Sequence, residues 1–72
     1  MNSQTIENIM NARKDIASAE IISSNLAIKL AEHGSSVSHQ TVVESSSMAA
    51  LLFSRACATL INELIKLELD KD

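Results

Sequence analysis

The chain has 72 residues, of which 46% are hydrophobic and 21% charged, with nine acidic side chains, six basic side chains and a single aromatic one, Phe53. This composition is typical of a globular rather than a disordered chain, yet so short a chain buries too little surface to be stable without further support. One cysteine excludes an internal disulfide framework, and two unclustered histidines disfavour a structural metal site. Association with another chain is the remaining source of stability.

The first predicted element is a helix over about residues 3–33, a run without glycine or proline. Ser3 or Thr5 is the expected N-cap residue, because a side-chain oxygen there can accept a hydrogen bond from a free backbone N–H group. His33 suits the negative end of the helix. Gly34, the only glycine in the chain, is expected to end the helix in the left-handed conformation.

A turn over about residues 34–38 then leads into a second predicted helix over about residues 39–69. Ser38 is the natural N-cap residue of this helix, while Thr41 and Glu44 offer a competing capping box that would start it one turn later. The chain is therefore expected to form one all-α domain, an antiparallel helical hairpin.

Both predicted helices carry an apolar arc of roughly 220° when projected at 100° per residue. A stripe of about 100° serves one contact, so each helix is expected to have two neighbours. A homodimer of hairpins, forming a four-helix bundle, is the simplest architecture that provides them. With the turn centred near residues 35 and 36, residues whose numbers sum to about 71 lie side by side, which would set Leu52 and Phe53 against Ala17 and Ala19.

Arg13 and Glu20 interrupt the apolar arc of the first helix, two turns apart on nearly the same line. Charge within an apolar contact is costly unless it is paired. Across a two-fold axis, Arg13 could meet Glu20 of a second copy and set the register of the dimer; the alternative is that both side chains extend to solvent. The candidate dimer interface consists of Ile9, Arg13, Ile16, Glu20, Phe53, Leu60 and Leu64.

Four other residues form a candidate partner-binding patch on the polar side of the helices. Ile22, Met48 and Leu51 are apolar where the projection faces water, and Arg55 lies one turn from Leu51. Methionine, aliphatic side chains and arginine together are typical of protein-binding surfaces. The alternative is that the helices are rotated and these side chains are buried in the bundle.

The sequence favours a protein that is not an enzyme and holds no cofactor or metal. Cys57 lies far along its helix from His39, so it has no base within reach. His33 and His39 flank the turn without a fixed carboxylate or thiol partner. A chain with one glycine also cannot form a glycine-rich phosphate loop. Cys57 is therefore expected to be a buried structural thiol.

Charge and hydropathy patterns bear on partners and location. The net charge is −3, and the acidic and basic residues alternate along both helices, which disfavours nucleic acid as a partner. No apolar run reaches the length of a membrane span, and the N-terminus lacks the layout of a signal peptide. A cytoplasmic protein without a membrane partner is expected.

In layout the chain resembles the plasmid copy-number regulator Rop, whose two-helix subunits dimerise into a four-helix bundle that binds paired RNA. The resemblance covers the layout alone, and no RNA-binding residue is carried over. The Ser- and Ala-rich stretch over residues 11–27 is similar to short helical proteins of bacteria, and this likeness implies no activity. Small regulators without catalytic sites are common among phage and plasmid proteins, so a phage or small bacterial origin is the prior expectation. The expected function is a homodimeric adaptor or inhibitor of another protein, the alternatives being a Rop-like RNA-binding regulator and a structural subunit of a larger helical assembly.

Overall fold

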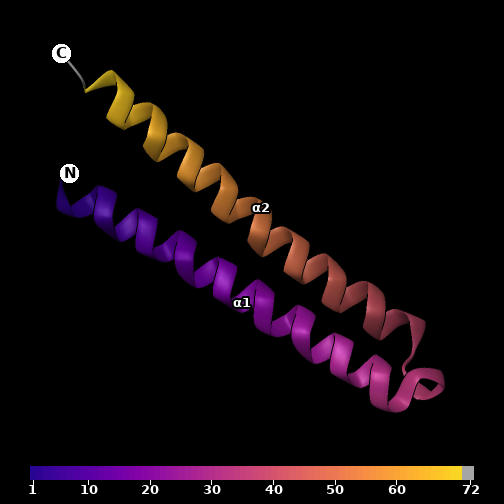
Figure 1. Cartoon of the computed structure of the whole chain (residues 1–72). Helices are drawn as coiled ribbons and strands as arrows, with labels where there is room; N and C mark the ends of the chain where they lie inside the picture. The colour runs from indigo at the N-terminus through magenta and orange to yellow at the C-terminus, as the bar shows by residue number, and fades with distance from the viewer. Residues whose placement is uncertain (71–72) are drawn as a thin grey trace.

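A computed structural model describes residues 1–70 as two long antiparallel helices joined by a short turn (Figure 1). Helix α1 spans Ser3–His33, the 3₁₀ turn η1 spans Gly34–Ser36, and helix α2 spans His39–Leu69. The Cα atoms form a rod that extends over 58 × 15 × 14 Å. The start of α1 and the end of α2 lie at one end of this rod, and η1 lies at the other (Figure 1). The predicted all-α helical hairpin is confirmed.

Capping side chains begin both helices. The predicted N-cap of the first helix, Ser3 or Thr5, was wrong, because Asn2 takes that position. The Asn2 Oδ1 atom accepts a hydrogen bond of 2.8 Å from the Thr5 backbone N–H group. The predicted cap of the second helix is confirmed: Ser38 Oγ accepts a bond of 3.1 Å from the Thr41 N–H group. Each cap satisfies a backbone donor that the first helical turn leaves without a partner.

The turn does not use the left-handed conformation expected of Gly34. This residue has φ −23° and ψ −65° and begins the 3₁₀ turn η1, and residues 1–70 contain no glycine with positive φ. The turn instead closes with a hydrogen bond of 3.3 Å from the Val37 N–H group to the Gly34 carbonyl. Helix α1 therefore continues into a tighter turn of the same hand.

Because its φ is negative, Gly34 should be replaceable by alanine. An added Cβ atom would meet no atom within 4 Å, and alanine also restricts the unfolded chain. We expect Gly34→Ala to leave the free energy of unfolding unchanged or raised by up to about 1 kcal/mol, as measured by urea denaturation. A clear loss of stability would show that the turn needs a backbone conformation open to glycine alone.

A narrow row of buried side chains, four of them alanines, forms the contact between the two helices. In α1 the buried residues are Thr5, Ala12 and Ala19, and in α2 they are Ala49, Ala56 and Glu63, so that each row repeats every seven residues. A seven-residue repeat keeps one stripe of each helix facing its neighbour along a coiled coil. We call these six residues the seam. Its alanines let the two backbones approach closely.

The register of the hairpin agrees with the predicted one. Asn8 bonds to Glu63 and Asp15 bonds to Arg55 across the two helices, and the residue numbers of these pairs sum to 71 and 70. Of the expected packing of Leu52 and Phe53 against Ala17 and Ala19, the part that involves Ala17 is wrong, since Ala17 is exposed. Phe53 does lie near Ala19, with which it lines a groove, but it remains 53% exposed.

Most of the large apolar side chains lie outside the seam. No large side chain is fully buried among the described residues, and the buried apolar core consists of four alanines. Large hydrophobic residues with more than a third of their surface exposed occur along both helices. They include Ile6, Met10, Phe53, Leu60 and Leu64. One hairpin therefore covers only a narrow part of each predicted apolar arc.

Candidate interaction surfaces

The two broad sides of the hairpin differ in chemistry. One side contains a groove of about 570 Å³ between the helices, in the half of the rod near the turn. Its lining is mostly apolar or small: Ile16, Ala19, Glu20, Ser23, Leu26, Ala27, Leu30, Ser45, Ser46, Ala49, Ala50 and Phe53. We call the side of the rod that carries this groove the apolar face.

All seven residues of the predicted dimer interface map to the apolar face. Ile16, Glu20 and Phe53 line the groove itself. Ile9 and Arg13 lie seven residues before Ile16 and Glu20, respectively. Leu60 lies seven residues after Phe53, and Leu64 lies eleven residues after it. Spacings of seven and eleven residues keep side chains on the same side of a helix. Arg13 and Glu20 are both exposed in the single hairpin.

The opposite side, which we call the polar face, carries an ion pair between the helices. Arg55 donates two hydrogen bonds of 2.8 Å to Asp15, from Nε to Oδ2 and from Nη2 to Oδ1. This fork geometry suits a carboxylate and fixes the direction of both side chains. Asn11, Lys14 and Thr59 lie around the pair in a shallow recess. The pair helps to align α1 and α2 at mid-rod.

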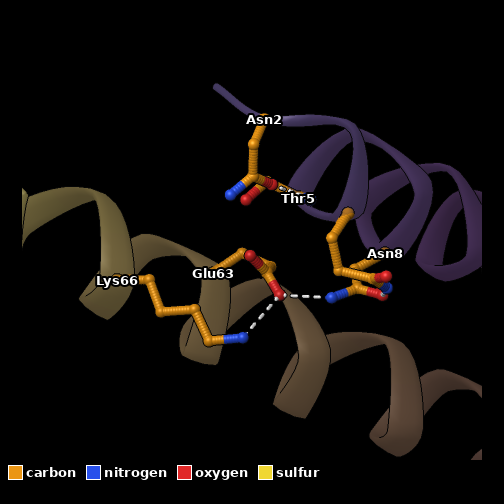
Figure 2. A network of polar contacts seen from close by, with 6 residues as sticks. Asn2, Thr5, Asn8, Glu63 and Lys66 are labelled. Carbon is orange, nitrogen blue, oxygen red and sulfur yellow. Dashed lines mark hydrogen bonds and ion pairs between the residues drawn. The ribbon is translucent and has the colours of Figure 1, made fainter.

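A second polar contact lies within the seam, near the free ends of the helices (Figure 2). Glu63 is only 3% exposed, and its Oε1 atom accepts bonds of 2.7 Å from Asn8 Nδ2 and 3.2 Å from Lys66 Nζ. Its other oxygen, Oε2, is buried without a hydrogen bond among the described residues. Glu63 thus occupies a seam position that an alanine fills elsewhere, and its bond to Asn8 favours one register over a slip of the two helices.

Both carboxylates are stabilised in their charged form. Hydrogen bonds from Arg55 hold the pKa of Asp15 below its ordinary value, an effect that the Arg55 charge reinforces and partial burial opposes. For Glu63 the hydrogen bond from Asn8 is the main reason that its pKa is lowered, with Lys66 and the Thr5 hydroxyl adding smaller contributions against the cost of burial.

These shifts predict that acid destabilises the hairpin. A carboxylate with a lowered folded-state pKa contributes stability above its unfolded pKa, and this contribution is lost as the pH falls through the folded pKa. We therefore expect a constant melting temperature from pH 7 to about 5 and a steady fall below about pH 4.5, the ordinary value for Glu63. The Glu63→Gln variant should fall less, because it lacks one of the titrating groups. A melting temperature that rises on acidification would show that burial outweighs the hydrogen bonds of Glu63.

The predicted partner-binding patch is divided between the two helices, with Ile22 in α1 and with Met48, Leu51 and Arg55 in α2. Met48 and Leu51 are exposed and Ile22 is half-buried. Arg55 is engaged with Asp15, so an incoming partner would have to share its guanidinium group or meet its outer edge. The patch therefore consists chiefly of the two exposed side chains.

Three residues with a structural role were not predicted from the sequence: Asn8, Asp15 and Glu63. Two signals bear on them. Once the seam is known, the spacing of Ala49, Ala56 and Glu63 by seven residues identifies Glu63 as a seam position. The register that sets numbers summing to about 71 side by side also places a carboxylate of α1 against Arg55.

The sequence was expected to contain no apolar stretch as long as a membrane span. The hydropathy of α2 corrects this expectation. By length and composition alone α2 could cross a membrane: a window of 18 residues reaches a mean hydropathy of 1.4, and 17% of that window is buried in the hairpin. A count of uninterrupted apolar residues does not detect this window, because serine and threonine residues are interspersed among the apolar ones. Such a window is also typical of a helix that is covered by protein.

Within residues 1–70, no group of three His, Cys, Asp or Glu side chains lies close enough together to hold a metal ion. Cys57 is half-buried rather than buried as predicted. No protein-family model, curated protein or solved structure matches the chain.

Proposed function

We propose that this chain is a non-enzymatic interaction protein, half of a homodimeric four-helix bundle that acts as an adaptor or inhibitor of another protein. The observation that carries the proposal is the uncovered apolar face. A hairpin whose buried apolar core is four alanines gains little free energy from its own folding, because burial of larger side chains supplies most of the stability of a small domain.

The continuity of the apolar surface along the rod supports a protein partner. Scattered single hydrophobic side chains on a surface are ordinary, but Ile9, Ile16, Phe53, Leu60 and Leu64 follow one another along one side of a rod. Continuous apolar surface of this kind is typical of interfaces. The polar face would remain outside the bundle and present Met48 and Leu51 to the regulated protein.

The test is the mass of the purified chain across a range of concentrations, by analytical ultracentrifugation. We expect twice the 7.8 kDa of one chain at micromolar concentration, with helix content and melting temperature that rise with concentration, as linked folding and association require. A chain that stays monomeric and helical at all concentrations would overturn the proposal.

Two alternatives are outcomes of parallel measurements. Co-sedimentation with lipid vesicles, together with a monomer in solution, would favour a membrane as the occupant of the apolar face, which the hydropathy of α2 allows. Binding of structured RNA by the dimer, with an affinity that falls steeply with added salt, would favour the Rop-like RNA-binding regulator over the adaptor or inhibitor.

A further inference from the structure

We infer that the apolar faces of two copies meet with their turns at opposite ends of the bundle, so that α1 packs against α1 and α2 against α2 of the second copy, both antiparallel. This inference rests on the proposed homodimer and specifies its geometry. Two features carry it: the charges of Arg13 and Glu20, and the different side-chain sizes in the two halves of the apolar face.

The charges of Arg13 and Glu20 place the two-fold axis. In a symmetric contact, residue i meets residue j and residue j meets residue i, so an axis midway between these residues joins Arg13 of each copy to Glu20 of the other. Facing residues of α1 then have numbers that sum to about 33. The axis passes close to the middle of α1, which spans Ser3–His33, so two rods of 58 Å would overlap along nearly their whole lengths.

The same axis sets large side chains of α1 against small ones. It brings Ile6 opposite Ala27 and Ile9 opposite Ser23 or its neighbour. Ala27 and Ser23 line the groove, whereas Ile6 is 51% exposed in the single hairpin. Large residues of the half near the chain ends thus enter the groove of the half near the turn, as interdigitation requires.

Helix α2 repeats this complementarity independently. Through the observed hairpin register, the axis crosses α2 between Ser54 and Arg55, so facing residues have numbers that sum to about 109. Leu60 then lies opposite Ala49, and Leu64 lies opposite Ser45. Both of these small residues line the groove. The position of the axis was derived from the charges of α1 alone, yet the same axis also sets large side chains of α2 opposite small ones.

A dimer with both turns at the same end would not fit. Helix α1 would then face α2 of the second copy, the two grooves would face each other, and Leu60 and Leu64 would meet the large residues of α1 near the chain ends. Arg13 and the second copy's glutamate would also be separated by seven residues along the rod, about 10 Å at the helical rise. Both the voids and the unpaired charges disfavour this arrangement.

The area of the contact matches that of a stable dimer. The Cα atoms of the hairpin cover 58 by 15 Å in outline, and a standard protein interface buries about 800 Å² on each partner. Full overlap of the two rods therefore provides enough surface. A staggered or partial overlap would not use the full length of the apolar face.

The first test uses charge reversal. The R13E chain and the E20R chain should each dimerise about 100-fold more weakly than wild type, because each homodimer would contain two contacts between like charges. Mixing the two chains should restore a dimer close to the wild-type affinity, since both contacts then join opposite charges. Equal affinity in the single variants and the mixture would overturn the pairing of Arg13 with Glu20.

The second test measures orientation. A spin label attached to the Ser36→Cys variant, in a Cys57→Ser background, reports the distance between the two turns by electron paramagnetic resonance. Turns at opposite ends should give a distance near the 58 Å length of the rod. A dimer with labels much closer than half that length would overturn the proposed geometry but leave the homodimer intact. A wild-type chain that stays monomeric would overturn the homodimer itself.

Discussion

If the chain forms the proposed homodimer, the Leu64→Asp substitution is expected to convert that dimer into a monomer and to abolish cooperative thermal unfolding at micromolar concentration, as measured by analytical ultracentrifugation and circular dichroism. Leu64 is 58% exposed in the single hairpin and lies on the apolar face, where a second copy would cover it. Burial of a leucine side chain contributes about 1.5–3 kcal/mol, and a symmetric dimer contains two of them. The dissociation constant should therefore rise by at least about 100-fold.

Leu51→Asp is the matched control for this experiment. Leu51 belongs to the same helix and is 62% exposed, but it lies on the side of α2 away from the apolar face. The control variant should retain the wild-type mass and melting temperature. Equal losses in the two variants would show that the association surface is not confined to the apolar face, and the reverse order would show that α2 uses its other side.

The second large effect is expected at the seam. Ala56 is completely buried between the two helices, so the longer side chain in Ala56→Leu would force α1 and α2 apart. Overpacking of a tight contact costs about 1–3 kcal/mol. For a domain of this size that cost lowers the melting temperature by at least about 4 °C, measured by circular dichroism at fixed protein concentration.

The control for the seam is Ala58→Leu, two residues along the same helix. Ala58 is exposed, and alanine and leucine have similar helix propensities. We therefore expect its melting temperature to stay within a few degrees of wild type. If Ala56→Leu were as stable as this control, the two helices would not be held at the close separation that the seam of alanines allows.

Several features of the fold could be predicted from local sequence alone. The lack of glycine and proline over residues 1–33 and the cap at Ser38 are properties of a few neighbouring residues, so the helices and the confirmed cap follow from them. The hairpin register also follows, since a short turn leaves the two helices little freedom to slide. The N-cap at Asn2 was not predicted, because Ser3 and Thr5 are also suitable N-cap residues. Only the extended backbone conformation at residue 2 shows that Asn2 takes this position.

The candidate site was predictable in outline and not in detail. Helical periodicity brings Ile9, Arg13 and the other predicted interface residues to one side of the rod, because that periodicity is local. Periodicity does not say which part of a wide apolar arc the hairpin itself covers. The register places Asp15 level with Arg55, but whether their side chains meet also depends on how far each helix is rotated about its axis.

The sequence by itself therefore determined two helices, their register and an excess of apolar surface, all of which depend on short-range preferences and on a period of 3.6 residues. The tertiary structure alone decided that the seam consists of alanines, with Glu63 buried at its end and the larger side chains left outside. Close approach of the backbones is possible only where small residues repeat on both helices. That requirement selects one narrow stripe from each arc and leaves the larger side chains of the apolar face exposed.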